Sequence, residues 1–509
     1  MLPADDVLDN YTRQVRRVAF SYVEPKVPKH PKLIHASKEV ANLLGISNQD
    51  LVSDDFLKIF SGAEIHPETT PYAMAYAGHQ FGNWAGQLGD GRAINLFEVL
   101  HNNKQYAVQL KGAGKTPYSR RGDGLAVLRS SIREYLCSEA MHHLGVPTTR
   151  ALSLALSGDE VLRDMLYNGN SAFEKGAIVC RVAPSFIRFG NFELFASRAD
   201  VTNLKRLTDY VIQQFYPFLG TPSKDTYISF FNEVTQRTLK MIIHWQRVGF
   251  VHGVMNTDNM SILGYTIDYG PYGWLEGYDY GWTPNTTDAQ NKRYRYGNQP
   301  NIALWNLLQL ANALYPLVED AKPFENILNN YKKQFDIQYL QMMCQKIGLK
   351  HKAEKDHQLI QDLEACLLLT ETDMTLFFRQ LSQFKNDQPA QGLSVIESAF
   401  YHPQELTSKI KNQWINWFEA YHNRLKKETQ TNAQRQNLMN TVNPKYVLRN
   451  YMAQLAIDAA NEGDYKLLED LFQLLKKPYQ EQPQQEKWYA KRPEWARHKV
   501  GCSMLSCSS

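Results

Sequence analysis

The sequence of 509 residues has few cysteines and little net charge. Its cysteines are scattered and include no C-x-x-C pair: Cys137, Cys180, Cys344, Cys366, Cys502 and Cys507. This spacing argues against a zinc site and favours a reducing cytosol. A formal charge of +4 is close to neutral for this length and leaves no polybasic field for nucleic acid. We therefore expect a cytoplasmic protein that does not bind nucleic acid.

Long apolar runs are also missing. No stretch of about 18 apolar residues occurs, so no membrane-spanning helix is expected. The N-terminal M-L-P-A-D-D-V-L-D-N has no apolar signal core, and its early acids disfavour a transit peptide. Hydrophobic residues make up 43% of the chain, which is typical of a globular protein with two or three domains or of one bilobal enzyme.

One stretch, His252 to Gly270, concentrates groups that suit a metal ion. It reads H-G-V-M-N-T-D-N-M-S-I-L-G-Y-T-I-D-Y-G. Asp258, Asn259 and Asp268 stand on either side of Met260–Leu263, a segment long enough for a short strand or hairpin arm. Hard oxygen ligands suit Mg²⁺, which keeps waters and substrate phosphates around it.

The same stretch has the spacing of two protein-kinase motifs, H-R-D-x-x-x-x-N and D-F-G. Here D-Y-G replaces D-F-G, and Val254 stands where the kinase base, an aspartate, is expected. An ordinary loop and turn is the alternative, with Asp258 and Asn259 closing one turn and Asp268 capping the next. A phosphate-binding region elsewhere in the chain would favour the first interpretation.

A glycine-rich segment further upstream is a candidate for such a region. The segment Y-A-G-H-Q-F-G-N-W-A-G-Q-L-G-D-G-R-A includes Gly86, Gly89 and Gly91, followed by Arg92. Glycines let backbone N–H groups approach a ligand, and arginine suits phosphate. A tight surface turn explains the glycines equally well.

Two β-like runs follow, Ala93–Leu100 and Gln105–Leu110, joined by a hairpin turn at His101–Lys104. Lys111 ends the second run, A-V-Q-L-K, in the position of the kinase lysine in V-A-I-K. A lone lysine at a strand end is otherwise a solvated group.

The basic loop G-A-G-K-T-P-Y-S-R-R-G-D-G then leads to an amphipathic helix, predicted from Leu125 to about Leu144. Asp123 lies where an N-cap would, followed by Gly124. Glu134 falls inside the helix, where an acid normally faces solvent. However, a strand lysine followed by a glutamate in mid-helix is also how kinases orient phosphates.

Two arginines follow a strand pair that is expected near 148–165. Arg181 and Arg188 lie in A-I-V-C-R-V-A-P-S-F-I-R-F-G, among β-branched and aromatic residues. Both look buried and need an anionic partner. A carboxylate of the protein and the triphosphate of a nucleotide would each serve.

The expected fold is α+β and bilobal, like that of protein kinases, with a β-rich N-lobe and an α-helical C-lobe. Its divisions would be an N-terminal extension at 1–80, a nucleotide-binding N-lobe at 81–200, a C-lobe with the catalytic and metal-binding loops at 201–423, and a helical extension with a Cys-containing tail at 424–509. Helices are expected over 201–248, 301–317, about 324–420 and 446–475. The polar run 424–436 is predicted to be an exposed helix or a linker.

Over nearly its whole length the sequence resembles the selenoprotein O family of kinase-like proteins. The matching segments are G-Q-L-G-D-G-R-A, V-Q-L-K-G-A-G-K-T-P-Y-S-R-R-G-D-G, R-V-A-P-S-F-I-R-F-G, H-G-V-M-N-T-D-N-M-S, I-D-Y-G-P-Y-G, N-P-K-Y-V-L-R-N-Y-M-A-Q and C-S-S. The resemblance implies a kinase-like fold that binds ATP upside down. It also implies transfer of AMP to Ser, Thr or Tyr hydroxyls of proteins, with pyrophosphate as leaving group, and it allows self-modification of this chain.

The resemblance assigns roles to residues at matching positions. Asn259 and Asp268 would hold Mg²⁺ or Mn²⁺, and Asp258 would be the general base that Val254 cannot be. Glu134 would pair with Lys111. The nucleotide-binding set would be Gly89, Gly91, Arg92, Lys111, Asp123, Gly124, Glu134, Arg181, Arg188 and Asp268.

Alternative functions stay open. A pseudokinase scaffold that binds a nucleotide without turnover would explain Val254, although Lys111, Glu134, Asn259 and Asp268 argue against it. Transfer of UMP with Mn²⁺ is also compatible with the resemblance. Phosphoryl transfer of ordinary polarity is disfavoured by the absent base.

One feature departs from the family. The resemblance to its bacterial members implies that a thiol near the C-terminus pairs with a cysteine after the D-Y-G segment. Residues 269–300 of this sequence, however, contain no cysteine. Cys507 occupies the place of the family's C-terminal thiol or selenocysteine. Either this redox lock is absent, or Cys507 uses another partner, for which Cys502 is the nearest candidate.

Overall fold

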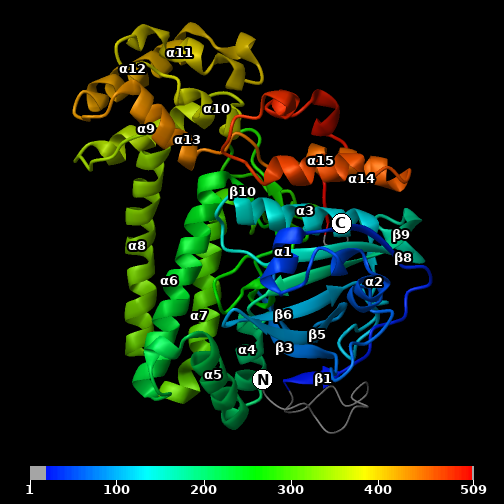
Figure 1. Ribbon diagram of the computed structural model, residues 1–509. Coiled ribbons are helices and arrows are strands. Elements are labelled where there is room, and N and C mark those ends of the chain that lie inside the picture. Colours follow the sequence, from blue (N-terminus) through cyan, green and yellow to red (C-terminus); the bar gives the residue numbers. More distant parts are fainter. Residues whose placement is uncertain (1–18, 507–509) are drawn as a thin grey trace.

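The computed structural model describes residues 19–506, and its first part is built on one antiparallel sheet (Figure 1). The strand order is β1-β3-β5-β6-β9-β8-β2, with β4 paired to β3 and β7 paired to β9. The strands are β1 (Phe20–Tyr22), β2 (Lys32–Ala36), β3 (Tyr72–Gln80), β4 (Asn83–Gly89), β5 (Ala93–His101), β6 (Lys104–Lys111), β7 (Ala126–Val127), β8 (Arg150–Asp164) and β9 (Ser171–Ala183). A separate pair is formed by β10 (Phe250–Val251) and β11 (Gly273–Trp274).

Helices make up most of the second part, which confirms the α+β class. The long helices α6, α7 and α8 run beside one another in Figure 1, next to the sheet. The helices are α1 (Lys38–Leu43), α2 (Asp54–Phe60), α3 (Leu128–His143), α4 (Phe189–Ser197), α5 (Val201–Phe215), α6 (Lys224–Val248), α7 (Gln299–Val318), α8 (Lys322–Lys346), α9 (Asp356–Leu367), α10 (Met374–Leu381), α11 (Gly392–Val395), α12 (Ser408–Leu425), α13 (Asn432–Val442), α14 (Asn450–Asn461) and α15 (Lys466–Leu475). No helix of the described residues is both long and apolar enough to cross a membrane.

The β5–β6 hairpin forms as predicted and sets the register of the site. Its turn residues Asn102 and Asn103 both have positive φ, 51° and 58°, which asparagine tolerates better than most residues. Across the next pair, Gln109 of β6 lies opposite Arg181 of β9. Side chains alternate between the faces of a strand, so Lys111, two residues beyond Gln109, shares the face of Gln109 and Arg181.

Helix α3 differs from its prediction in two ways. It begins at Leu128, because Ala126 and Val127 first pair with β9 as β7. Asp123 therefore does not cap the helix; its Oδ1 accepts from Leu125 N at 3.0 Å. The helix is also buried on all sides from Leu128 to Met141 and is not amphipathic.

The C-terminal helices bury the side of α3 that faces away from the sheet. One side of α3 packs on β8 and β9, while α14 and α15 pack on the other. Tyr135 of α3 stacks on Phe472 of α15, with ring centroids 5.6 Å apart. His35 of β2 joins the same contact, with its Nε2 at 2.6 Å from Oε2 of Glu469. The C-terminal extension thus seals the helix that carries Glu134.

Three other expected elements differ from the structure. The segment 148–165 is not a strand pair but contains the single strand β8, whose partner β9 begins at Ser171. Met260–Leu263 forms no strand or hairpin arm; Ser261 makes an isolated bridge with Arg188, just before α4. The segment 446–475 contains two helices, α14 and α15, rather than one continuous unit.

The predicted N-terminal extension, residues 1–80, contributes strands to the main sheet. Strands β1, β2 and β3 all come from 1–80 and belong to the main sheet, and residue 80 falls at the end of β3. Residues 1–18 lie outside the described part of the chain. Cys502 is buried near the C-terminus. Cys507 lies outside the described residues, so its pairing stays a prediction.

Candidate active site

A cavity of about 720 Å³ lies between the sheet and the loops that follow α6. Most of the predicted site residues line it: Gly89, Gly91, Arg92, Lys111, Asp123, Gly124, Arg181, Asp258, Asn259 and Asp268. Glu134 and Arg188 are not part of the lining, but each contacts a residue that is. Segments that are far apart in the sequence therefore meet at one site.

Lys111 and Glu134 form a buried ion pair between β6 and α3. The second Glu134 oxygen accepts from Arg181 Nη1 at 3.0 Å, and the Glu134 side chain is only 2% exposed. Burial alone would raise the pKa of Glu134, but Lys111 and Arg181 hold it below its usual value. Glu134 is thus an ionised group of the site and not a surface acid.

Asp268 lies between two arginines. Its carboxylate accepts from Arg181 Nη1 at 2.8 Å and from Arg188 Nη1. Burial would raise the pKa of Asp268, but Arg188, Arg181 and Lys111 outweigh it and hold the pKa far below its usual range. Its φ of 57° is left-handed, an uncommon state for a residue with a side chain.

Arg188 is the more deeply buried of the two arginines. Besides Asp268, it lies 3.7 Å from the buried carboxylate of Asp90 and donates to the backbone oxygen of Asp258 at 2.8 Å. The Arg188 guanidinium also lies over the aromatic ring of Tyr76, with its Cζ 4.6 Å from the ring centroid. The anionic partners of Arg181 and Arg188 in this structure are therefore carboxylates of the protein.

Asp258 and Asn259 lie on a short 3₁₀ turn, Thr257–Asn259. Gln80 Nε2 donates to Asp258 Oδ2 at 3.2 Å, while Asp258 Oδ1 is buried with no hydrogen-bond partner. Burial raises the pKa of Asp258 to about 6, against the opposing effect of Gln80. Asn259 donates through Nδ2 to Val254 O at 2.9 Å, which leaves its Oδ1 as an acceptor.

The glycine-rich loop between β6 and β7 closes one side of the cavity. Gly124 has a φ of 72°, and a Cβ there would lie 2.0 Å from Gly114 O, so only glycine fits. Next to it, Asp123 binds Arg163 through two hydrogen bonds of 2.7 and 2.8 Å. The loop also contributes Arg120 and Arg121 to the lining.

Several lining residues were not predicted from the sequence. Asp90 lies inside the quoted G-Q-L-G-D-G-R-A segment, where an acid flanked by glycines was a usable signal. Gln80 and Asn256 gave no signal, because their roles depend on contacts across more than 170 residues. Asn256 Oδ1 accepts from Phe81 N at 3.1 Å and from Tyr294 OH at 2.6 Å.

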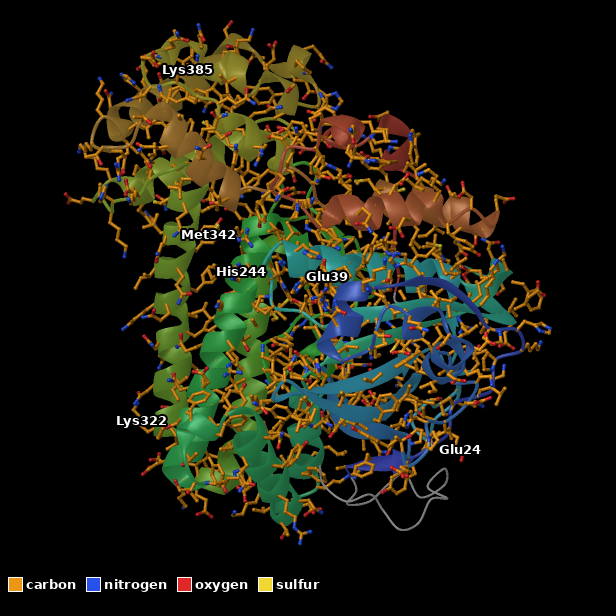
Figure 2. All side chains as sticks on the ribbon, in the orientation of Figure 1. Glu24, Glu39, His244, Lys322, Met342 and Lys385 are labelled. Atoms are coloured by element: carbon orange, nitrogen blue, oxygen red, sulfur yellow. The ribbon has the colours of Figure 1, made fainter. Side chains whose placement is uncertain are left out.

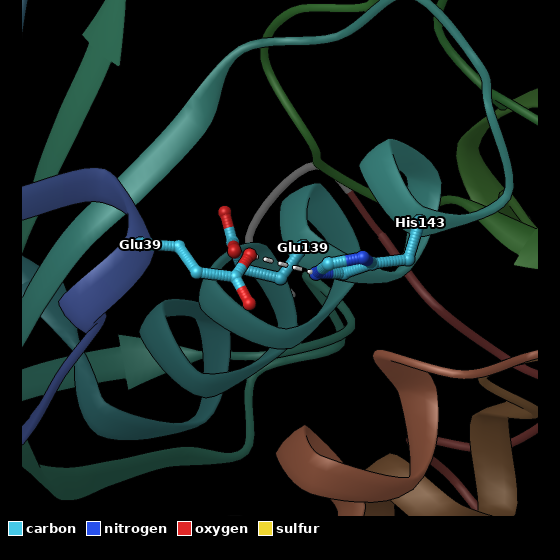
Figure 3. Close-up of side chains that lie close together, drawn as sticks. All are labelled: Glu39, Glu139 and His143. Carbon is cyan, nitrogen blue, oxygen red and sulfur yellow. Dashed lines mark ion pairs between the residues drawn. The ribbon is translucent and has the colours of Figure 1, made fainter. Parts of the chain in front are cut away.

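Among the described residues, one group of three side chains could hold a metal ion by proximity alone (Figure 3). It consists of Glu39 on α1, also labelled in Figure 2, with Glu139 and His143 on α3. Arg150 binds both oxygens of Glu139 at 2.6 Å, and Lys476 binds Glu39 at 2.6 Å. The group is thus part of an ion-pair network that joins α1, α3 and β8, and it lies outside the lining of the cavity.

The family resemblance implies that replacing Lys111 by alanine weakens nucleotide binding and transfer together, because the lysine is a buried cation that lines the cavity. Lys104→Ala is the matched control, since Lys104 lies at the exposed end of the same strand. Calorimetric titration with Mg²⁺–ATP would show a loss of at least about 10-fold in affinity for Lys111→Ala only. Equal affinities for both variants would contradict a role for Lys111 in binding.

Comparison with known proteins gives the class of this chain as protein nucleotidyltransferase. The family model "Protein adenylyltransferase SelO" matches residues 9–476. The chain belongs to the SelO family.

Curated relatives match along the full chain. "Protein nucleotidyltransferase YdiU" of Flavobacterium johnsoniae is 62% identical over 509 residues, covering 100% of this chain and 98% of the relative. The protein of the same name from Rhodopirellula baltica is 53% identical, with 100% and 97% covered. That of Aromatoleum aromaticum is 52% identical, with 100% and 98% covered. The resemblance to this family is therefore confirmed.

Proposed function

We propose that this enzyme transfers AMP from ATP to Ser, Thr or Tyr hydroxyls of proteins, with pyrophosphate as leaving group. The observation that carries the proposal is the cavity in which Lys111, Arg181 and Asp268 meet while Val254 replaces the kinase base. With ATP inverted relative to kinases, the buried cations would face the terminal phosphates. Stabilising the charge that develops on the leaving group is where such a site gains most of its rate.

The proposal includes a protein-kinase-like arrangement of the chain. Residues 81–200, with β4 to β9, α3 and α4, would form the N-lobe, to whose sheet the extension 1–80 adds β1 to β3. Residues 201–423, with α5 to the greater part of α12 and the loops after α6, would form the C-lobe. The buried Lys111–Glu134 pair between a strand and a helix supports this arrangement. The predicted divisions at 80, 200 and 423 and the cytoplasmic location belong to the same proposal.

Asn259 and Asp268 would hold a divalent metal ion, Mg²⁺ or Mn²⁺. Both line the cavity, both offer hard oxygen atoms, and the buried Asp258 Oδ1 beside them lacks a hydrogen-bond partner. This donor set fits such an ion, which would supply positive charge at the phosphates. The chain's own cations Lys111 and Arg181 would orient the triphosphate.

Asp258 would accept the proton of the attacking hydroxyl. The residue lines the cavity, and its Oδ1 is free of partners within the protein. Gln80 occupies only Oδ2, and because Oδ1 is buried, a substrate hydroxyl would have to enter the cavity to reach it. A general base needs this reach to the proton that it removes.

Incubation with labelled nucleotides tests the proposal. ATP labelled at the α-phosphate should label protein hydroxyls, whereas ATP labelled at the γ-phosphate should not. The same assay with α-labelled UTP and Mn²⁺ measures the competing transfer of UMP. Label from the γ position alone would assign the enzyme to phosphoryl transfer, and no label from any nucleotide would favour a binding scaffold.

A further inference from the structure

The turn that carries Asp258 is hydrogen-bonded to the end of β3. His79 N donates to the hydroxyl oxygen of Thr257 at 2.8 Å, on the residue directly before Asp258. Thr257 is fully buried and does not line the cavity. It is therefore placed to act on Asp258 without touching a nucleotide.

A buried pair of side chains stands behind this contact. His79 Nδ1 lies 2.6 Å from Oε1 of Glu193 on α4, and the Glu193 side chain is only 4% exposed. Burial raises the pKa of Glu193, and the Thr257 hydroxyl beside it partly offsets the rise. The Thr257 hydroxyl thus joins the turn to the end of β3, and the His79 side chain joins the same end of β3 to α4.

The same end of β3 leaves no spare room around the turn. A Cβ on Gly78 would lie 2.8 Å from Thr257 Oγ1 and 3.3 Å from Asp258 Cβ. The next residues of the strand hold two successive residues of the turn, His79 through its backbone to Thr257 and Gln80 through its side chain to Asp258. Three consecutive strand residues therefore fix the position of the turn.

We propose that Thr257 is a positioning residue for nucleotidyl transfer, whose hydroxyl anchors the Asp258 turn to the end of β3. This inference rests on the proposed role of Asp258 as the base. A displacement of about 1 Å in a reacting group can cost on the order of 10²-fold in rate, so loss of the anchor affects turnover more than binding.

Thr257→Val tests the anchor, because valine keeps the shape of threonine and removes its hydroxyl. We expect kcat to fall by about 10- to 100-fold with the Kd for Mg²⁺–ATP unchanged. Thr257→Ser keeps the hydroxyl and should restore most of the turnover. Thr235→Val is the matched control, since Thr235 is equally buried on α6 and bonds only to its own helix at Phe231 O.

Two further variants make the test decisive. If Thr257→Val does not fold, Gly78→Ala disturbs the same turn from the strand side and should give the same loss in kcat. In an Asp258→Asn background, Thr257→Val should cause no additional loss, because the two residues act as one unit. Parental turnover by Thr257→Val, or a loss that persists undiminished in the Asp258→Asn background, would overturn the positioning role. The second of these results would leave the base role of Asp258 standing, whereas parental turnover by Asp258→Asn alone would overturn that role.

Discussion

Asp268→Asn is expected to lower nucleotidyl transfer by about 10³-fold or more, because it removes the one carboxylate that lies between Arg181 and Arg188. The amide keeps the size of the side chain but brings no negative charge to the ion site or to the two guanidinium groups. Binding of Mg²⁺–ATP should weaken strongly as well. Transfer of α-labelled AMP and calorimetric titration with Mg²⁺–ATP measure the two effects.

The same change should also lower stability, which must be measured separately. Breaking one side of a buried ion pair typically costs about 3–5 kcal/mol, and Asp268 is 22% exposed, which favours the lower end. Asp209→Asn serves as control, because it removes a surface ion pair with Lys205 at 2.5 Å. If Asp268→Asn bound Mg²⁺–ATP and turned over like the parent, the segment around Asp268 would be an ordinary turn.

Asp258→Asn is expected to lower kcat by about 10²- to 10⁴-fold while leaving the affinity for ATP nearly intact. The amide oxygen can still accept from Gln80 Nε2, so the turn should keep its place. The amide cannot take a proton from a hydroxyl. Steady-state transfer, nucleotide titration and thermal melting together separate this result from a loss of structure.

The comparison with Lys111→Ala makes the assignment specific. That variant should lose binding and turnover together, whereas Asp258→Asn should lose turnover alone. Near-normal turnover by Asp258→Asn would remove Asp258 from the mechanism. Its buried, unpartnered Oδ1 would then need another explanation, such as an ion ligand.

The parts of the site that depend on local pattern could be predicted from the sequence. The β5–β6 hairpin and the lysine at its end follow from strand alternation and turn residues within 20 positions. The spacing of Asp258, Asn259 and Asp268 is similarly local. These features are fixed by neighbours along the chain, which a sequence displays directly.

The parts that depend on distant contacts could not be predicted. The burial of α3 on the side away from the sheet comes from α14 and α15, which lie more than 300 residues further along the chain, so the local pattern of α3 predicts a one-sided helix. The roles of Gln80 and Thr257 could not be predicted from the residues next to them in the sequence, because each contacts a partner that is 178 positions away. The carboxylate partners of Arg181 were undecided for the same reason.

The cover that α15 gives to α3 bears on how this enzyme can change over evolutionary time. Phe472 and Glu469 contact Tyr135 and His35 from a segment that lies more than 300 residues beyond both of them. Tyr135 is the neighbour of Glu134 on α3, so α15 packs directly behind the helix that carries the buried Lys111–Glu134 pair. The final helices are therefore no optional module that could be exchanged or trimmed between relatives. Exchange of the final helices for a poorly matched pair would expose the Tyr135 face of α3 to water.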